Sequence, residues 1–447
     1  MPYVPHTIED RDEMLARVGV KSIDDLFHDV PKDLRIAPGS LDIEPCLDES
    51  RIVSTLSKLA ATNKSAEDLK CFLGAGIYDR FIPSSVGAII SRGEFLTAYT
   101  PYQPEASQGF LQTIYEFQSM IAELYGMEVA NASMYDGATS MAEAAIMAHS
   151  INGKSKVAVS EGVNPHYRQV LETYCWALGL EVVTIPCTNG LTQDYSSAGE
   201  DISSIIVGYP NFFGIIEDLN QAKKAAESSK SLLIVVADPV SCAVLPPPGE
   251  FGADVVVGEG QSLGVSMGFG GPLVGLFTCN EEHVRRLPGR IVGKTSEIHG
   301  DKSGFAMTLR TREQDIRREK ATSNICTNEA LMALANTVYL SALGKNGLTQ
   351  VATSSVQNSR YAMKVLANAG GKVKFSSPMF CEFVLELPAN ATQVRHELID
   401  HGILAGLPLG KYYSGMDNCL LVAVTEKKTK QDIDDFGVAL AAVLGAN

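Results

Sequence analysis

The chain has 447 residues, of which 45% are hydrophobic, and 37 basic against 52 acidic residues give it a formal net charge of −15. A chain of this length and apolar content can bury a sizeable core, so we expect a globular protein with one large and one small domain, or at most three domains. No Lys/Arg tract is dense enough to follow a phosphate backbone, and we therefore expect no nucleic-acid partner.

The cysteines, the histidines and the first residues narrow the class of protein further. The nine cysteines include no CxxC pair, and the first thirty residues lack the apolar core of a signal peptide, which favours a reducing cytoplasm. No apolar run reaches the length that spans a membrane. HELIDH places His396 and His401 five residues apart, whereas HExxH requires four, so we expect no metal.

Residues 1–70 are expected to form an N-terminal helical arm of short helices with polar starts. In three places a Thr or Ser precedes an Asp by three residues, which resembles a capping box with Asp in place of the preferred Glu or Gln. These pairs are Thr7 with Asp10, Ser22 with Asp25, and Ser65 with Asp68.

A long amphipathic helix is predicted within SQGFLQTIYEFQSMIAELYG. Its apolar residues recur at alternating steps of four and three, which places them on one face that packs into the core. The residues on this face are Phe110, Ile114, Phe117, Ile121 and Leu124.

The following part of the chain predicts a large α/β domain over residues 71–325. The apolar runs KVAVS, EVVTIP, SSIIVGYP, LLIVVADP and ADVVVG recur with helical or polar segments between them. Such runs are typical of strands buried on both faces of a mostly parallel sheet. Residues 326–447 then predict a helical connection and a small C-terminal α/β domain, whose last helix begins after a Thr429 cap.

Two glycine-rich segments resemble nucleotide-binding motifs without satisfying them. GEGQSLG follows a strand, but its third glycine, Gly264, comes one residue too late for the dinucleotide fingerprint. PGRIVGKTS has three residues between its glycines where a P-loop needs four, and we interpret it as a charged loop.

The strand ends and one helix start fit a pyridoxal-phosphate site better. Such a site needs a phosphate cradle at a helix N-terminus, an acid for the pyridinium nitrogen and a lysine that forms a Schiff base. Gly137, Thr139 and Ser140 precede a helical run, and Asp238 ends the strand LLIVVADP. The next strand end carries Gln261, whose carboxamide cannot form an imine. The sequence thus predicts a degenerate cofactor site in an α/β, aminotransferase-like (fold-type I) transferase fold.

Six segments resemble signatures of the glycine cleavage system P-protein. They are FLGAGIYDRFIPSSV, FLTAYTPYQPEASQG, NASMYDGATSMAEA, PPGEFGADVVVGEGQ, FGGPLVG and TREQDIRREKATSNICT. The resemblance spans nearly the whole chain, which is similar to the N-terminal half of the single-chain form or to subunit 1 of the two-subunit form. In that family the lysine lies in the second half, and its position falls on Gln261 here, so the chain resembles a degenerate copy of the catalytic half.

The resemblance implies a glycine dehydrogenase (aminomethyl-transferring, decarboxylating) that is active only as a heteromer with a homologous subunit 2. Subunit 2, and not this chain, would bind pyridoxal phosphate covalently, and the aminomethyl group of glycine would pass to the lipoyl arm of the H-protein. Side chains of this subunit are expected to complete the partner's active site in trans. They are Tyr99, Tyr102, Gln103, Glu105, Arg312, Thr322, Ser323 and Asn324.

Two features depart from the family pattern, and two other classes of protein stay open. Asp315 stands where the family usually has His, and GKT at residues 293–295 is not the usual wording. One alternative is a self-sufficient pyridoxal enzyme that uses Lys294 or Lys302, although both lie about thirty or more residues beyond the expected strand end. The other is a non-catalytic regulatory or scaffolding pseudo-enzyme of the same fold, which gives no reason for the motif YTPYQPE.

Overall fold

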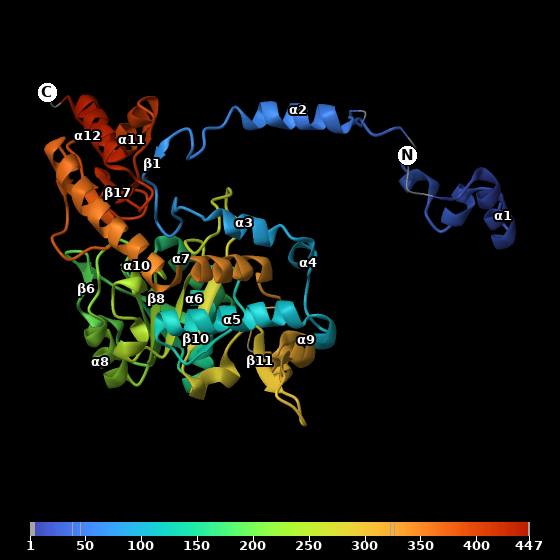
Figure 1. Ribbon diagram of the computed structural model, residues 1–447, viewed down its shortest axis with the longest axis horizontal. Coiled ribbons are helices and arrows are strands. Elements are labelled where there is room, and N and C mark those ends of the chain that lie inside the picture. Colours follow the sequence, from blue (N-terminus) through green and yellow to red (C-terminus); the bar gives the residue numbers. More distant parts are fainter. Residues whose placement is uncertain (1–4, 38, 45, 322, 326, 446–447) are drawn as a thin grey trace. The chain divides into compact units, whose positions relative to one another are not determined.

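The computed structural model describes residues 5–37, 39–44, 46–321, 323–325 and 327–445 (Figure 1). Contacts between residues divide the chain into two compact units, Met1–Lys64 and Ser65–Asn447. The first unit corresponds to most of the arm that the sequence predicts. No helix within the described ranges is long and apolar enough to cross a membrane.

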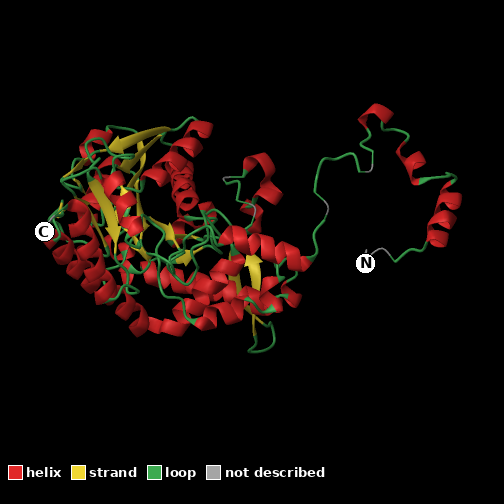
Figure 2. Ribbon diagram, turned by 90° about the horizontal axis from the view of Figure 1, so that it is seen from above, coloured by secondary structure: helices red, strands yellow, loops and turns green. Residues whose placement is uncertain are grey.

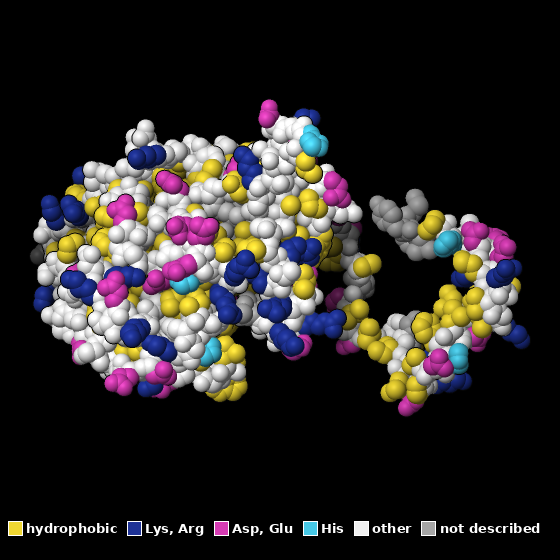
Figure 3. Space-filling model, turned by 90° about the horizontal axis from the view of Figure 1, so that it is seen from below, with side chains coloured by type: hydrophobic (Ala, Val, Ile, Leu, Met, Phe, Trp, Pro, Cys, Tyr) yellow, Lys and Arg dark blue, Asp and Glu magenta, His cyan; other side chains and the backbone are white. Residues whose placement is uncertain are grey.

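The N-terminal unit consists of short helices joined by loops (Figure 2), and none of its described helical residues is buried. The capping boxes of Thr7 with Asp10 and of Ser22 with Asp25 are confirmed, because in each pair both side chains accept a backbone N–H of the other residue. Apolar side chains lie along the surface of this unit (Figure 3). Its helices are α1 (Ile8–Val18), the 3-10 helices η1 (Ile23–Phe27) and η2 (Lys32–Leu34), and α2 (Glu49–Ala60).

The second unit, called the body below, is built on a seven-stranded sheet with the order β2-β10-β9-β8-β7-β3-β4 (Figure 1). Strands β4, β3, β7, β8 and β9 run parallel, whereas β10 pairs antiparallel with β9 and β2. The predicted mostly parallel sheet is therefore confirmed, and the five quoted apolar runs form its parallel strands. The strands are β2 (Val129–Ala130), β3 (Lys156–Ser160), β4 (Glu181–Ile185), β7 (Ile202–Tyr209), β8 (Leu232–Ala237), β9 (Val255–Glu259) and β10 (Gly275–Cys279).

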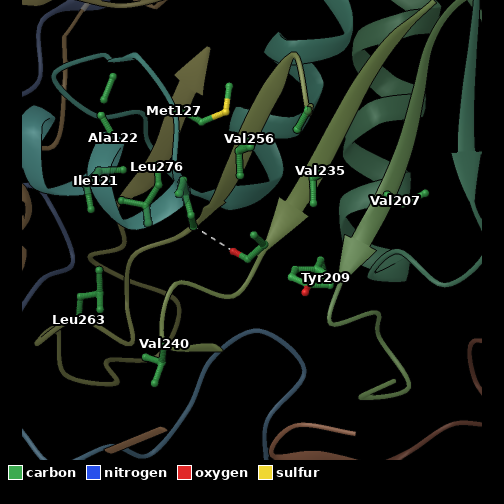
Figure 4. Packing of buried hydrophobic residues seen from close by; sticks show 14 of the residues in the cluster. Ile121, Ala122, Met127, Val207, Tyr209, Val235, Val240, Val256, Leu263 and Leu276 are labelled. Atoms are coloured by element: carbon green, nitrogen blue, oxygen red, sulfur yellow. Dashed lines mark hydrogen bonds between the residues drawn. The ribbon is translucent and has the colours of Figure 1, made fainter. Parts of the chain in front are cut away.

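Helices cover both faces of this sheet. Successive side chains of a strand point to opposite faces, so a strand made only of apolar residues presents an apolar surface on each side. Val207, Val235 and Val256 lie side by side on one face (Figure 4), in a cluster with α5, α8 and α10. Ile234 and Val255 belong to the cluster on the other face, with α6 and α7. These helices are α5 (Gln108–Tyr125), α6 (Gly137–Asn152), α7 (Pro165–Leu178), α8 (Leu219–Ser229) and α10 (Ala330–Asn368).

The long amphipathic helix that the sequence predicts is α5. Its expected apolar face turns inward, since the first four residues of that face are buried and the fifth is half-buried. The helix ends at Gly126, whose φ of 67° is the left-handed conformation that glycine adopts readily.

The C-terminal part of the body forms a second, antiparallel sheet with the order β13-β14-β17-β16. It follows α10, whose helical geometry is interrupted at Gly344. The Thr429 cap is confirmed, because its hydroxyl accepts the N–H of Asp432 at 3.1 Å. The domain boundary at residue 325 stays a prediction. The elements are β13 (Lys372–Val373), β14 (Glu382–Glu386), α11 (Ala391–Asp400), β16 (Leu407–Pro408), β17 (Cys419–Ala423) and α12 (Lys430–Leu444).

Several short elements differ from the sequence-based expectations. Ser65 and Asp68 hydrogen-bond to each other but close a turn and start no helix. PGRIVGKTS is largely a strand and not a loop, because Ile291 and Val292 are buried and the segment pairs with the strand after residue 302. The short elements are β1 (Lys70–Cys71), α3 (Ser84–Ile90), α4 (Gly93–Leu96), β5 (Cys187–Thr188), β6 (Leu191–Thr192), β11 (Ile291–Ser296), β12 (Ser303–Thr308), α9 (Gln314–Arg317) and β15 (Ile403–Leu404).

Candidate functional site

A cavity of about 80 Å³ lies beyond the carboxyl ends of β7, β8 and β9. Its walls include Asp238 after β8, Glu259 at the end of β9, Tyr167 from α7 and Glu382 from β14. Ligands of open α/β sheets usually bind at this edge. The cavity therefore lies where the sequence places the degenerate cofactor site.

Asp238 occupies the strand-end position of an acid that would face a pyridinium nitrogen. One of its carboxylate oxygens accepts the N–H of Ser241 at 2.8 Å. Burial raises the pKa of Asp238, while the guanidinium of Arg80 and the backbone donors act in the opposite direction. Asp238 thus keeps the place and the polar character that such a role would need.

The N-terminus of α6 carries the residues predicted to cradle a phosphate, but their donors already have partners within the chain. The N–H of Gly137 donates to a carboxylate oxygen of Glu259 at 2.9 Å. The N–H of Thr139 donates to the Asp136 carboxylate at 2.7 Å, and the hydroxyl of Ser140 donates to the Asp136 carbonyl at 2.7 Å. A phosphate group would have to displace these carboxylates.

Gln261 is 2% exposed, and backbone groups use its whole carboxamide. Its amide oxygen accepts the N–H of Tyr78 at 2.9 Å. Its amide nitrogen donates to the carbonyl of Tyr78 at 3.1 Å and to that of Val265 at 2.8 Å. The side chain therefore pairs with the Tyr78 peptide as a neighbouring strand would, and it fixes the position of that loop.

The residues around this cavity do not fit pyridoxal phosphate. The described residues that line it include no lysine, and Lys294 and Lys302 lie in or beside the β11/β12 hairpin instead. A volume of about 80 Å³ holds a few water molecules, at roughly 10–15 Å³ for each. The alternative of a self-sufficient pyridoxal enzyme finds no support in this arrangement. In the described part of the chain, no three His, Cys, Asp or Glu side chains gather in a way that could hold a metal ion.

A second group of polar residues, called the Arg290 cluster, consists of Thr100, Tyr102, Arg290, Glu313 and Thr327. The Arg290 guanidinium donates to the hydroxyls of Thr100 at 3.2 Å, Thr327 at 2.9 Å and Tyr102 at 3.2 Å. It also lies 3.5 Å from the carboxylate of Glu313. The cluster joins the motifs YTPYQPE, TREQDIRREK and EKATSNICT, which are far apart in sequence, at one point of the fold.

Tyr102 is an exposed member of the Arg290 cluster with a fixed position. Its ring centroid lies 5.6 Å from the guanidinium of Arg290 and 5.5 Å from that of Arg310, yet 51% of the residue is exposed. Tyr99, which is 75% exposed, lines a neighbouring surface hollow of about 650 Å³ together with Thr100. The predicted tyrosines therefore present phenol groups on an open surface.

Arg312 lies beside the cluster with an incomplete set of partners. One of its terminal nitrogens donates to the carbonyl of Leu287, whereas Nε and the other terminal nitrogen have no hydrogen-bond partner among the described residues. Burial lowers the pKa of Arg312, and it raises the pKa of Glu313 against the opposing charge of Arg290. The partly buried charges make this region sensitive to substitution.

The segment after α9 contains the other residues predicted to reach the partner. The hydroxyl of Ser323 accepts the N–H of Ile325 at 3.1 Å and interacts with the buried carboxyl of Glu143. Burial raises the pKa of Glu143 to about 7. Asn324 is exposed, and Thr322 lies outside the described residues.

The remaining predicted residues lie at the edge of the Arg290 cluster. Gln103 and Glu105 are exposed and follow Tyr102 on the same segment. Asp315, which departs from the family pattern, pairs with Arg310 at 3.2 Å. Because Arg310 flanks the ring of Tyr102, Asp315 helps to hold the side of the cluster that faces solvent.

Arg290 and Glu259 are not among the predicted site residues, although each has a signal in the sequence. Arg290 stands in PGRIVG, part of the segment whose glycine spacing predicts a charged loop. Glu259 precedes Gln261 by two residues, and side chains two apart on a strand share a face. An acid at residue 259 therefore predicts that a carboxylate, and not a phosphate group, lies near the N-terminus of α6.

An open, mostly parallel sheet with a strand-end acid is the fold of the fold-type I pyridoxal-phosphate-dependent enzymes. The alanine–glyoxylate aminotransferase of Nostoc sp. has this fold too, with a TM-score of 0.60 and 16% identity over 92% of this chain and 100% of that chain. The chain belongs to the glycine cleavage system P-protein family, whose family model matches residues 1–440.

Two closer relatives support the same family. The chain is 47% identical over 435 residues to the probable glycine dehydrogenase (decarboxylating) subunit 1 of Anoxybacillus flavithermus, with 97% of each chain covered. It is also similar to a solved structure of glycine decarboxylase (P-protein) of the glycine cleavage system in inhibitor-bound form. The TM-score is 0.92 and the identity 44%, over 99% of this chain and 100% of that chain.

Proposed function

We propose that this chain is subunit 1 of a two-subunit glycine dehydrogenase (aminomethyl-transferring, decarboxylating) and that it acts only with a homologous subunit 2. The observation that carries the proposal is the Arg290 cluster, which presents the hydrogen-bonded phenol of Tyr102 on an exposed surface. The filled cofactor site, in which Glu259 meets the cradle and Gln261 stands at the anchor position, is the reason for assigning the cofactor to subunit 2. In the complex, subunit 2 holds pyridoxal phosphate, glycine is decarboxylated there, and the aminomethyl group passes to the lipoyl arm of the H-protein. The complex is expected to act in the cytoplasm.

The Arg290 cluster is the part of this chain that completes the partner's active site. Pro101 and Pro104 restrict the backbone on both sides of Tyr102, so its phenol is presented without a large loss of conformational freedom. The phenol oxygen accepts a hydrogen bond from Arg290, and its own O–H can donate to a carboxylate such as that of glycine. Tyr99, Gln103 and Glu105 extend the same exposed surface.

The segment 323–325 supplies a second set of polar groups to that site. Asn324 exposes an amide that can both donate and accept, and Ser323 adds a hydroxyl. Two buried nitrogens of Arg312 have no hydrogen-bond partner among the described residues, and a guanidinium suits a carboxylate or phosphate oxygen. These groups bind and orient a ligand, while the covalent chemistry belongs to subunit 2.

The N-terminal unit provides a surface through which the chain holds its partner. Its large apolar side chains are exposed although such residues usually lie in a core or an interface. An apolar surface of this kind suits an obligate interface, and the homologous subunit 2 is its proposed occupant. Examples are Ile8, Val18, Phe27, Leu34, Ile36, Ile43, Leu56 and Leu59.

Reconstitution with purified subunit 2 tests the proposal. Neither chain alone should release CO2 from glycine, and the mixture should do so. Borohydride reduction followed by peptide mapping should then find a saturable pyridoxyl adduct on subunit 2 and none on this chain. A specific adduct on Lys294, Lys302 or any other lysine of this chain, or a stable monomer in the presence of micromolar subunit 2, would contradict the proposal.

A non-catalytic scaffold is the second candidate, because the filled cofactor site is equally compatible with it. The two functions differ at the Arg290 cluster. A scaffold needs assembly alone, so Tyr102→Phe should leave the activity of a fully assembled complex unchanged. A contribution to the partner's active site requires that the same variant assembles normally and loses activity.

A further inference from the structure

The carboxylate of Glu259 is bound at the N-terminus of α6 by three backbone donors. One of its oxygens accepts the N–H of Gly137 at 2.9 Å. The other accepts the N–H of Gln261 at 3.0 Å and that of Val274 at 3.3 Å. Glu259 is 7% exposed, so the arrangement is closed to bulk solvent.

This position is the one at which a helix binds anions most readily. The first N–H groups of a helix lack acceptors within the helix, and the helix dipole adds positive potential there. In the 16-residue helix α6, two of these groups, the N–H of Gly137 and that of Thr139, donate to the carboxylates of Glu259 and Asp136. Burial raises the pKa of Glu259 to about 7, while its three N–H donors act in the opposite direction.

The space around Gly137 is also filled. A Cβ atom at residue 137 would lie 2.5 Å from the phenol oxygen of Tyr167 and 3.1 Å from Cβ of Glu259. The N–H of Gly137 is therefore already used, and the side chains of Tyr167 and Glu259 occupy the space on the Cβ side of Gly137.

We propose that Glu259 is a built-in substitute for the phosphate group, which bars this chain from binding a phosphorylated cofactor even before any covalent anchor is considered. The inference rests on the proposed function, which it deepens, because it assigns the loss of cofactor binding to two separate changes. One is the missing lysine at position 261. The other is the carboxylate at position 259, which acts on the non-covalent binding step.

Substitutions in the complete complex with subunit 2 separate the two changes. At pH 8, Glu259→Ser should open an anion site, so that inorganic phosphate binds at least about tenfold more tightly than to the wild-type complex, as followed by phosphorus NMR titration. Glu382→Ser is the matched control, since it removes another buried carboxylate of the same cavity without opening the helix N-terminus. It should leave phosphate binding unchanged.

Covalent capture gives an independent readout. Gln261→Lys alone should give no saturable pyridoxyl adduct at residue 261 after borohydride reduction and peptide mapping of this chain. The same substitution combined with Glu259→Ser should give one with pyridoxal phosphate, and about tenfold less with unphosphorylated pyridoxal.

Three results would overturn the inference. They are capture by Gln261→Lys alone as efficient as by the double variant, a folded Glu259→Ser complex that gains no phosphate affinity, and an equal gain in the Glu382→Ser control. Each of these leaves the proposed function standing if the wild-type chain carries no adduct and the complex is active. An adduct on the wild-type chain would refute both.

Discussion

Arg290 allows a direct test of how the cluster named after it is held together. The substitution Arg290→Met keeps most of the side chain's length and removes the guanidinium. That group is 5% exposed, donates to three hydroxyls and lies beside Glu313, whose side chain is 7% exposed. The substitution therefore removes the nearest of the positive charges that face a buried carboxylate, whereas Arg310 stays 3.9 Å from it.

The expected loss of stability follows mainly from that carboxylate. Removing one partner of a buried ion pair costs about 3–5 kcal/mol, because the other charge stays buried and uncompensated. Tyr102 is half exposed and can bond to water instead, so its lost hydrogen bond adds little. Because Arg310 still lies 3.9 Å from Glu313, we expect the free energy of unfolding of the body to fall by about 3 kcal/mol, the lower end of that range.

Urea unfolding of the purified chain measures this difference, and two further variants serve as controls. Arg310→Met removes a charge that is 36% exposed and lies 3.9 Å from Glu313, and it should cost no more than about 1 kcal/mol. Adding Glu313→Gln to Arg290→Met should restore part of the loss, because the stranded charge is gone. A loss below about 1 kcal/mol for Arg290→Met, or a further loss on adding Glu313→Gln, would refute the reasoning.

Three other predictions concern the active site, pH and the backbone. In the reconstituted complex, Tyr102→Phe, Ser323→Ala and Asn324→Ala should each slow glycine decarboxylation about five- to a hundredfold. This is the effect of losing one active-site hydrogen bond worth roughly 1–3 kcal/mol. Wild-type rates in all three variants would leave this subunit only a scaffolding role. Burial raises the pKa of Glu382 to about 7 from 4.5, so the folded protein holds this proton more tightly than the unfolded chain does. The stability that proton binding by Glu382 contributes is therefore fully present below pH 4.5 and is lost as the pH rises to 7. Glu382→Gln should remove this part of the pH dependence of the urea midpoint, and an unchanged profile would count against it. Gly214→Ala should cost at least about 2 kcal/mol, because its φ is 82° and the new methyl group would lie 2.0 Å from the Glu382 carbonyl oxygen; an unchanged Tm would contradict this.

The main sheet and α5 could be predicted from local patterns. The parallel strands β3, β7, β8 and β9 are apolar runs because both of their faces are buried, whereas the edge strand β4 is only partly buried. Helix α5 shows one apolar stripe because only one of its faces is buried. Strand β11 could not be predicted in this way. Only Ile291 and Val292 of it are buried, and its strand character depends on pairing with β12.

The candidate site shows a similar division between local and distant effects. Asp238 and the start of α6 could be predicted, because a strand-end acid and a capping sequence are local features. The bond between Glu259 and Gly137 joins residues 122 apart in the chain, and the bond between Gln261 and Tyr78 joins residues 183 apart. No local pattern specifies which side chain meets which backbone group over such separations.

Strand β1 stands near the start of the body, yet the groups that hold it come from the far end of the chain. Lys70 and Cys71 pair with Ile403 and Leu404, and the Lys70 ammonium binds Asp435, which lies 365 residues later. During synthesis on a ribosome these partners emerge long after β1, so the backbone of β1 stays without them until residues 403–435 have been translated. Closing so long a loop costs little extra free energy, but it delays this contact relative to local ones. A chain that terminates before α12 would therefore present β1 without the carboxylate that holds its lysine.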